Sequence, residues 1–340
     1  DYAGFEARRA EARKRGRLRG IGLSNSIEKA AGPGIEAAEL RFDRSGSATI
    51  LVGSVSNGQG HETVFKQIVC DQLGMKPQDI GYVSGDTDKV AFGHGTGGSR
   101  SAAHGGAAVN LATTKIVAKA RKIAAHMMET DVGDLVFEAG VFTLAGTDRR
   151  ITIKEIAKAA ADPKNVPPGE EPGLIASAVH TIEQATYPNG CHVCEVEIDE
   201  ETGIVEILNY NVVDDVGTVM NPLLLKGQIY GGVAQGIGQI LLEDLHYDKS
   251  SGQLVTASFM DYAMPRASDF CLMAVQTNEV HTNANPLGIK GAGEAGTVGA
   301  LSAVANAIVN ALSSLGIRDI PMPATPERIW RAITVAKSRP

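Results

Sequence analysis

Glycine-dense turns, each followed by a helical pattern, are the feature that most restricts how this chain can fold. The most distinctive turn runs from Gly288 to Thr297 and reads GIKGAGEAGT. The apolar residues of the next stretch, Val298–Leu312, recur at helical spacing. Gly291, Gly293 and Gly296 remove side chains where the backbone comes close to another group. The sequence therefore predicts a helix whose N-terminal amides can face an anion.

Glu294 is the acid of this turn. A carboxylate in such a turn is a candidate general base, because its neighbours set its proton affinity. The same residues also fit G-x-G-x-x-G, which is a weak motif on its own. A packing turn that carries an exposed Glu explains them as well. The residues alone leave both interpretations open.

Two earlier turns have the same design. SNGQGHET at 56–63 precedes a helical pattern over 64–73, and GHGTGGSRS at 93–101 precedes one over 102–128. The second turn also matches G-x-G-x-x-G. A dinucleotide-binding fold needs an acid about 20 residues later, at the end of a strand, and that position falls inside the helix here. The amides of these turns instead suit a long polar ligand with a diphosphate.

A fourth glycine cluster lies in the helix predicted over Leu225–Leu242. Its glycines are Gly227, Gly231, Gly232, Gly236 and Gly238. So many glycines are costly in one helix, which indicates that something approaches it closely. Gln228 and Gln235 are seven residues apart and share a face of this helix. Either their amides bind a polar ligand, or the glycines permit a tight helix–helix contact.

Composition sets broad limits on function. A chain of 340 residues can form two subdomains or one large domain. Its 39 acidic against 32 basic residues give a net charge of −7, which does not favour nucleic acid as a partner. The basic cluster Arg8–Arg19 is interpreted as the solvated face of a surface helix. No apolar run is judged long enough to cross a membrane and no signal peptide is recognised, so a cytoplasmic protein is expected.

The four cysteines are expected to be reduced thiols. Cys191 and Cys194 frame the sequence CHVC, which invites a metal or redox interpretation. However, this stretch opens a strand-like run, in which positions three apart point to opposite faces. No second Cys or His pair completes a zinc site, and no iron–sulfur spacing exists. Cys70 and Cys271 stand alone. No residue is therefore assigned as a metal ligand.

The order of elements predicts an α+β fold with two subdomains of mixed β-sheet and flanking helices. A Pro-, Gly- and Glu-rich stretch at 162–173 is the candidate linker, which gives subdomains over 1–165 and 174–340. Helices are expected over 1–17 and 152–161, and after the N-cap pair Thr325-Pro326. Strands are expected over 21–28, 34–42, 48–54, 80–84, 254–259 and 271–277, with hairpins over 135–144 and 191–213.

The ordered set of motifs resembles the C-terminal, molybdenum-cofactor half of the xanthine oxidase family of molybdenum hydroxylases. It is most similar to large subunits of the aerobic carbon monoxide dehydrogenase type. The matching motifs are GQGHET at 58–63, GDTD at 85–88, GTGGSRS at 95–101, DDVG at 214–217, NP at 221–222, GQ at 227–228, GGVAQG at 231–236 and GAGE at 291–294. Any one motif is weak, but their order and spacing together are specific.

The resemblance implies roles for individual residues. The metal would be held by the dithiolene of a molybdopterin, in its cytosine dinucleotide form, and not by protein side chains. Glu294 stands where the family has the base that removes a proton at the metal centre. The residues that match cofactor-binding positions, or lie in the same turns, are Gln59, Gly60, His61, Thr96, Gly98, Ser99, Arg100, Ser101, Gln228, Gln235, Lys290, Gly291 and Gly293.

The chain also departs from the family pattern. The family's N-terminal portion, with its Gly-Gly-x-Phe-Gly loop and the Cys loop that marks carbon monoxide dehydrogenases, is not in this sequence. A cut fragment and a separately encoded half-subunit both fit. The implied partners are that N-terminal half, an iron–sulfur subunit with 2Fe-2S, a flavin subunit with FAD, and a small-molecule substrate. Carbon monoxide, an aldehyde and an N-heterocycle remain open as substrates.

Two other functions stay under consideration. A nicotinamide-dependent (NAD) dehydrogenase would use Gly291–Gly296 as its phosphate turn with Asp319 as the acid, but the polar segment His281–Pro286 replaces the strand that should precede the turn. A non-catalytic scaffold would keep the fold and bind cofactor only when assembled, or never.

Overall fold

The computed structural model describes residues 1–338, which form two compact units. The first unit combines residues 1–29, 187–280 and the stretch from 292 onward. The second unit combines residues 30–186 and 281–291. Each unit is therefore built from stretches that are far apart in the sequence.

This division differs from the contiguous subdomains expected over 1–165 and 174–340. The first strand, β1 (Arg17–Ile27), pairs along its whole length with β9 (Asn189–Asp199) and so joins the later part of the chain. The supposed linker 162–173 lies inside the second unit, where Gly173 N donates to Ala160 O at 2.7 Å. A Pro- and Gly-rich composition is typical of any surface loop, so it did not distinguish a linker. The pairing of strands that are distant in sequence cannot be recognised from composition.

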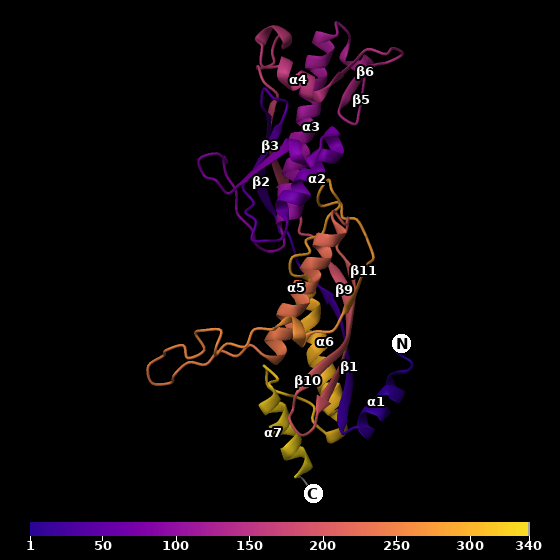
Figure 1. Ribbon diagram of the computed structural model, residues 1–340, viewed down its shortest axis with the longest axis vertical. Helices are drawn as coiled ribbons and strands as arrows, with labels where there is room; N and C mark the ends of the chain where they lie inside the picture. The colour runs from indigo at the N-terminus through magenta and orange to yellow at the C-terminus, as the bar shows by residue number, and fades with distance from the viewer. Residues whose placement is uncertain (339–340) are drawn as a thin grey trace. The chain divides into compact units, whose positions relative to one another are not determined.

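A four-stranded sheet in the order β1-β9-β10-β11 is the centre of the first unit (Figure 1). β9 and β10 (Val205–Asp215) form the expected antiparallel hairpin, and β11 (Met273–Thr277) adds in parallel to β10. Both faces of β9 are covered. Cys194, Val196 and Ile198 join the hydrophobic core on one face, and the side chains of Glu195 and Glu197 lie on the other.

The helix α6 (Ala295–Leu312) covers the apolar face of this sheet, in contact with β1 and β9. A methyl group at Gly22 would lie 2.1 Å from Ala303 O, and one at Gly20 equally close to Ala307 O, so only glycine lets α6 lie this near β1. The segment Ala295–Leu315 is long and apolar enough to cross a membrane by composition, with a mean hydropathy of 1.5, contrary to the sequence expectation. Its apolar residues supply the core of the unit.

Three more helices complete the first unit. α5 (Pro222–Leu241) packs against α6, while α1 (Phe5–Lys14) lies on β1 and α7 (Pro326–Lys337) follows the stiff segment near the C-terminus. Asn221 and Thr325 cap α5 and α7, because each side chain accepts a hydrogen bond from the backbone N–H three residues later. Thr325-Pro326 therefore opens a helix as predicted.

The glycines of α5 divide into two groups. A methyl group at Gly232 would meet Thr297 N at 2.9 Å, and one at Gly236 would meet the Ala300 methyl at 2.7 Å. At Gly227 and Gly231 an added methyl would meet nothing within 4 Å. Tight contact with α6 therefore explains Gly232 and Gly236, and contact with Pro265, which would lie 2.5 Å from an added methyl, explains Gly238. Gly227 and Gly231 leave an open face on α5.

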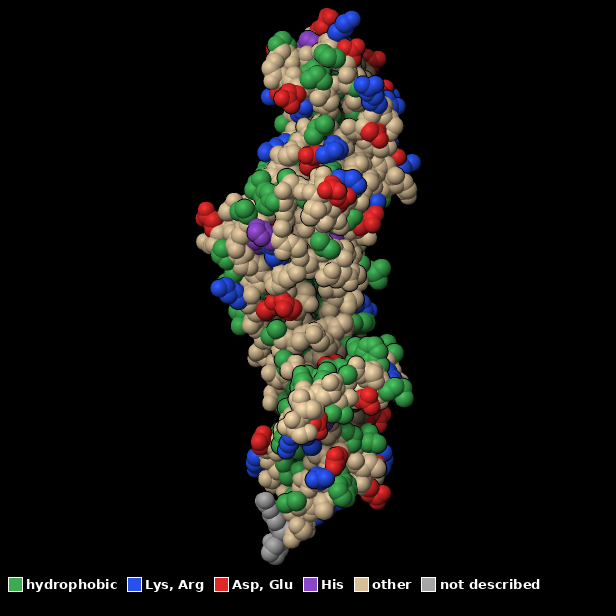
Figure 2. All heavy atoms as spheres, turned by 90° about the vertical axis from the view of Figure 1, so that its left-hand side faces the viewer, with side chains coloured by type: hydrophobic (Ala, Val, Ile, Leu, Met, Phe, Trp, Pro, Cys, Tyr) green, Lys and Arg blue, Asp and Glu red, His purple; other side chains and the backbone are tan. Residues whose placement is uncertain are grey.

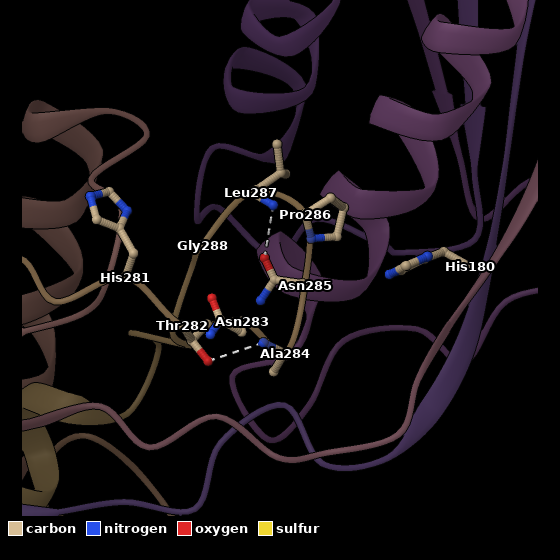
Figure 3. Close-up of a pocket in the computed structure, with 9 residues that line it drawn as sticks. All are labelled: His180, His281, Thr282, Asn283, Ala284, Asn285, Pro286, Leu287 and Gly288. Atoms are coloured by element: carbon tan, nitrogen blue, oxygen red, sulfur yellow. Dashed lines mark hydrogen bonds between the residues drawn. The ribbon is translucent and has the colours of Figure 1, made fainter.

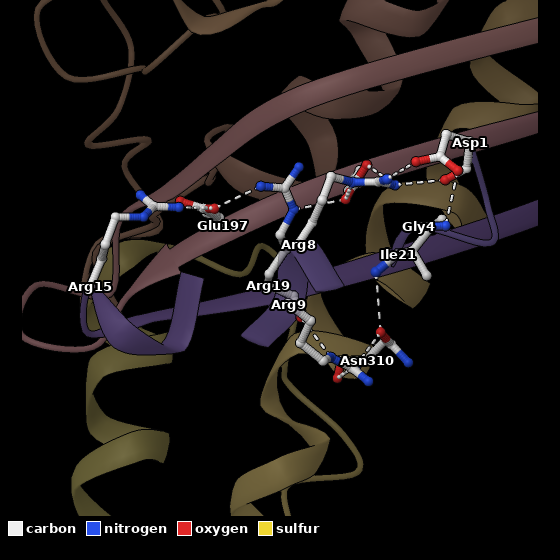
Figure 4. Close-up of polar contacts among 10 residues, drawn as sticks. Asp1, Gly4, Arg8, Arg9, Arg15, Arg19, Ile21, Glu197 and Asn310 are labelled. Carbon is white, nitrogen blue, oxygen red and sulfur yellow. Dashed lines mark hydrogen bonds and ion pairs between the residues drawn. The ribbon is translucent and has the colours of Figure 1, made fainter. Parts of the chain in front are cut away.

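The basic cluster is only in part the solvated face that the sequence suggested: Arg13 and Lys14 are exposed, whereas other arginines bind buried carboxylates. Arg8 Nε and Arg19 Nε donate to Glu195 Oε1 at 3.0 and 2.7 Å, and Arg15 Nη2 donates to Glu197 Oε1 at 2.6 Å (Figure 4). Burial raises the pKa of Glu195, but the hydrogen bonds from Arg8 and Arg19 outweigh it and leave the pKa below its ordinary value. The basic cluster thus fastens α1 to the sheet.

A long loop segment, residues 243–272, follows α5 (Figure 1). The strand expected over 254–259 does not form, and an isolated bridge between Tyr247 and Leu254 is the pairing found there. Several of its large apolar side chains are exposed: Leu245, Tyr247, Val255, Phe259, Met260, Met264 and Leu272.

Figure 2 shows acidic and basic side chains interspersed over the visible face, with hydrophobic side chains between them.

The second unit is built on a sheet in the order β4-β3-β2-β8. Its strands are β2 (Gly34–Phe42), β3 (Ala48–Val52), β4 (Ile80–Ser84) and β8 (Ile175–Ile182). The long helix α3 (Ser101–Met127) packs across β2 and β8, and α2 (His61–Leu73) packs beside α3. Both helices begin directly after glycine turns, as the sequence predicted.

A second, three-stranded sheet in the order β5-β6-β7 extends the second unit. The expected hairpin forms as β5 (Leu135–Glu138) and β6 (Val141–Leu144), with β7 (Arg150–Thr152) beside it. The helix α4 (Ile153–Ala159) begins with a capping box between Thr152 and Glu155.

Short 3₁₀ turns are at Pro77–Asp79, Val132–Asp134, Pro163–Asn165, Ala267–Asp269 and Ser313–Leu315.

Adjacent glycines of α5 give a matched pair for testing the helix contact. Gly232→Ala should lower the free energy of unfolding by about 1–3 kcal/mol, because the new methyl overlaps the α6 backbone. Gly231→Ala should raise it by about 0.5–1 kcal/mol, because the methyl meets open space and alanine favours the helix. Urea unfolding of both variants measures the difference. Equal effects of the same sign would contradict this packing.

Candidate functional site

The predicted site residues fall into two groups, one in each unit. The second unit holds the larger group: Gln59, Gly60, His61, Thr96, Gly98, Ser99, Arg100, Ser101, Lys290 and Gly291. The first unit holds Gln228, Gln235, Gly293 and the candidate base Glu294. Each group has its own geometry.

The turn 93–101 is tied to neighbouring segments by its side chains. Thr96 Oγ1 donates to Val55 O at 2.5 Å and lies 3.0 Å from Ser101 Oγ. Ala31 N donates to Gly98 O at 2.9 Å. The hydroxyl groups of Thr96 and Ser101, both predicted to bind cofactor, thus hold the turn in shape.

The glycines of the same turn face open space. A methyl group added at Gly95, Gly97 or Gly98 would meet nothing within 4 Å. Gly95 and Gly98 have φ values of 66° and 58°, and Ser99 shares this left-handed conformation at 53°. Successive amides in such a conformation form a concave anion-binding nest. The turn therefore has the space and the donors that a phosphate-bearing ligand needs.

Gly291 brings the loop 281–291 directly against this turn. A methyl group at Gly291 would lie 2.1 Å from Ser99 O, so no other residue fits there. Gly291 N donates to Thr186 Oγ1 at 3.2 Å, which fixes the loop on the same unit. The structure thus brings together Gly291 and Ser99, as the prediction of a shared site requires.

Arg100 does not point as a simple phosphate ligand would. Its Nη2 donates to Ile35 O at 3.1 Å and to Glu36 Oε2 at 3.3 Å, and its side chain is largely buried. Sequence reasoning missed Glu36. The signal was present, because Glu36 occupies an inward position of β2 that otherwise carries Ala38, Leu40 and Phe42.

The turn 56–63 forms the entry to α2. Gln59 Oε1 accepts hydrogen bonds from Asn57 N at 2.5 Å and from Ser56 Oγ at 3.5 Å. Gly60 is the N-cap of α2 with a φ of 81°, and His61 is its first residue. His61 is buried and stacks on Phe65, with ring centroids 5.6 Å apart. Among residues 1–338, its Nδ1 finds no hydrogen-bond partner.

Burial lowers the pKa of three histidines in the second unit. Desolvation is the first cause for His61, His104 and His180, and the charge of Arg100 adds to it at His104. His104 Nε2 lies 3.0 Å from Gly32 O. The neutral form of the imidazole is therefore favoured at all three histidines.

A pocket of about 530 Å³ lies in the second unit beside the loop 281–288 (Figure 3). His180 and the loop residues line it. The loop is fixed by the buried Asn285, whose Oδ1 accepts hydrogen bonds from Leu287 N and Ile289 N, each at 3.2 Å. None of the predicted site residues lines this pocket.

In the first unit, Glu294 is the N-cap residue of α6 and is exposed. Its carbonyl oxygen accepts hydrogen bonds from Thr297 N and Val298 N at 3.0 and 3.1 Å, and its side chain makes no capping bond to the helix. Gln235 Oε1 accepts from Thr297 Oγ1 at 3.0 Å, so this amide lies beside the first turn of α6. Gln228 is half-buried on α5, between the open glycines Gly227 and Gly231.

A buried polar group also lies against this end of α6. His192 is bonded through Nδ1 to the Tyr210 hydroxyl at 2.9 Å and through Nε2 to Asp214 Oδ1 at 3.2 Å. A methyl group at Gly299 would lie 2.5 Å from the imidazole, so the ring rests on the helix backbone. The second residue of the CHVC stretch is thus a packed, hydrogen-bonded core histidine.

Metal-binding side chains are not gathered anywhere in the described residues 1–338: no group of three or more His, Cys, Asp or Glu could hold an ion. The four cysteines are free thiols, as expected.

The comparisons identify the class of protein. The sequence profile of the molybdopterin cofactor-binding domain family matches residues 1–271, and the chain belongs to this family. This confirms the resemblance to the molybdenum hydroxylases and the mixed α+β fold.

Individual relatives are similar over nearly the whole chain. The gamma subunit of the 6-hydroxypseudooxynicotine dehydrogenase complex of Paenarthrobacter nicotinovorans is 39% identical over 93% of this chain and 40% of its own length. The nicotine 6-hydroxylase large subunit of the same organism is 38% identical over 98% of this chain and 42% of its own. The crystal structure of a Cu,Mo-CO dehydrogenase superposes with a TM-score of 0.90 and 35% identity, over 99% of this chain and 44% of that one. The chain thus spans less than half of each of these relatives.

The buried histidines predict how stability depends on pH. A histidine whose folded pKa is depressed binds more protons when unfolded, so the free energy of unfolding should fall as pH drops below about 6.5. His61→Gln should make this fall shallower, because one such imidazole is removed. Urea unfolding at pH 7.5 and 5.5 measures the slope, with the exposed His94→Gln as control. A slope unchanged by His61→Gln would contradict the assignment.

Proposed function

We propose that this chain forms the cofactor-binding part of a molybdenum-dependent hydroxylase. The observation that carries the proposal is the turn 93–101, where the space beside Gly95, Gly97 and Gly98 is open while Thr96 and Ser101 anchor the turn. Membership of the molybdopterin cofactor-binding family supports the same ligand. The first unit contributes an exposed carboxylate at the start of a helix, Glu294.

The residues divide the work as follows. The amides of Gly95–Ser99 and the N-terminus of α2 at Gly60 and His61 would bind the phosphate and pterin groups through N–H donors. Gln228 and Gln235 would offer amides from the open face of α5. When bound, the molybdopterin would supply the metal and the two-electron redox chemistry of hydroxylation. Glu294 would accept a proton as general base.

The finer assignments follow from the same proposal. A diphosphate fits the several amide-rich turns better than a single phosphate does, which favours the cytosine dinucleotide form of the cofactor. Lys290 and Gly293 flank Gly291 and would join the cofactor contacts of their respective units. We assign 2Fe-2S and FAD to partner subunits, with the rest of the large subunit as a further partner. The substrate would be a small molecule, namely an aldehyde, an N-heterocycle or carbon monoxide, in a cytoplasmic enzyme.

The NAD alternative lacks structural support. A dinucleotide-binding turn must follow a strand, but no strand is formed over residues 278–294. The preceding strand, β11, ends at Thr277 and lies far back along the chain from the turn.

Glu294→Gln tests the assigned base. In the assembled enzyme, turnover should fall by about 10²–10⁴-fold, because the amide cannot accept the proton, while molybdenum content persists. Steady-state kinetics and metal analysis by mass spectrometry give the two readings. Glu201→Gln, at the exposed β9–β10 turn, is the matched control and should keep its turnover.

The outcomes separate the competing functions. Retained turnover in Glu294→Gln would reject the base. One molybdenum per assembled wild-type complex supports catalysis, whereas none in any preparation would support the scaffold interpretation. Tight NAD binding to the chain would revive the dehydrogenase.

Gly97→Val tests the open turn. The Cβ of the new side chain meets no described atom within 4 Å, so thermal unfolding of the cofactor-free protein should change little. The side chain would occupy space that the ligand needs, so the pterin content of the assembled enzyme should fall several-fold. Full pterin content in this variant would move the cofactor site away from the turn.

A further inference from the structure

Glu36 is a fully buried carboxylate in the floor beneath the turn 93–101. It is 0% exposed and lies on the inward face of β2, where its neighbours along the strand are Ala38 and Leu40. A charged group in such a position is unfavourable unless it is paired and hydrogen-bonded. The contacts of Glu36 therefore indicate what the residue is for.

Apart from a hydrogen bond that Ala37 N donates to Glu36 Oε1 at 3.3 Å, these contacts involve segments that frame the turn. Glu36 Oε2 accepts hydrogen bonds from Arg100 Nη2 and from Ser54 Oγ, both at 3.3 Å. Arg100 is the residue that ends the turn and precedes α3, and its side chain is 16% exposed. Its Nη2 also donates to Ile35 O at 3.1 Å. The Arg100 guanidinium is thus hydrogen-bonded to β2 and is not directed toward a ligand bound at the turn.

The other end of the turn is fixed over the same carboxylate. A methyl group at Gly53 would lie 2.9 Å from Glu36 Oε1 and 2.3 Å from the Cα of Gly93. The segment after β3 and the start of the turn therefore cross in backbone contact above Glu36. Between Gly93 and Arg100, the glycines of the turn contact no other part of the chain in the space where a side chain would project. The turn is thus held at its ends, and also through Thr96 and Gly98, while the Cβ positions of its middle glycines stay open.

We propose that Glu36 is a positioning residue for the cofactor, which acts by anchoring Arg100 so that the amides of residues 95–99 stay preorganised around a phosphate-bearing ligand. The inference rests on the proposed function, because it assumes that the turn binds such a ligand. It also reassigns Arg100 from a direct ligand contact to an anchor. Preorganised donors bind more tightly because less ordering remains to be done on binding.

Glu36→Gln tests this in the assembled enzyme, because it keeps the size of the side chain and removes its charge. Loss of pterin from the isolated complex, followed by fluorescence of the oxidised pterin, should be about 10- to 100-fold faster, the effect typical of removing a group that supports a ligand. Amide hydrogen exchange in residues 95–99 of the cofactor-free protein should also be faster. Asp79→Asn, which breaks the Asp79–Lys154 pair of the same unit at 2.5 Å, is the matched control.

A double variant separates positioning from general stability. Glu36→Gln with Arg100→Met restores a neutral site, so its thermal unfolding temperature should recover toward that of the wild type. Pterin loss should remain fast, because the link from the end of the turn to β2 is still missing. Recovery of both quantities together would overturn the proposal and make the pair merely structural, as would unchanged pterin loss and unchanged exchange in Glu36→Gln. If wild-type complex contains no pterin, the proposed function itself fails, while the exchange measurement still tests the anchor.

Discussion

Close approach between backbones, possible only at glycine, is the constraint on which both units depend. In the first unit α6 rests on Gly20 and Gly22 of β1, and Gly232 of α5 meets α6 in the same way. In the second unit Gly53 and Gly93 cross in contact, and Gly291 lies against Ser99. A side chain at any of these positions would separate segments whose contact shapes the candidate site, so the glycine content of this chain is a consequence of its geometry.

The sequence predicted the local structure well and the long-range organisation poorly. Apolar periodicity located the helices that follow the three glycine turns, the capping pair Thr325-Pro326 located α7, and the β9–β10 hairpin formed as expected. The division into units could not be predicted, because it depends on the pairing of β1 with a strand more than 160 positions later. Arg8 and Arg19 looked solvated for the same reason: their partner, Glu195, is distant in sequence.

The candidate site shows a similar limit. The turns and Glu294 were found because their residues are contiguous, whereas Glu36 and the bonded group around His192 are assembled from separate strands. A glutamate on the inward side of β2 was a usable signal, since an unpaired carboxylate there would be unstable. The roles of Thr96 and Arg100 could not be inferred from sequence, because a side chain that binds a ligand and one that ties down a turn belong to the same residue types.

Some glycines are in close contact with a neighbouring segment, and others face open space. This contrast links the fold to the proposed function. Gly53, Gly232 and Gly291 are each required by a neighbouring part of the chain, so packing accounts for them completely. Gly97 and Gly231 have no such neighbour, and glycine is unfavourable where nothing demands it, in a helix most of all. A group outside the described residues accounts for them more simply than chance does. For Gly97, the proposed group is the phosphate-bearing ligand, because backbone N–H groups of a turn can bind an anion.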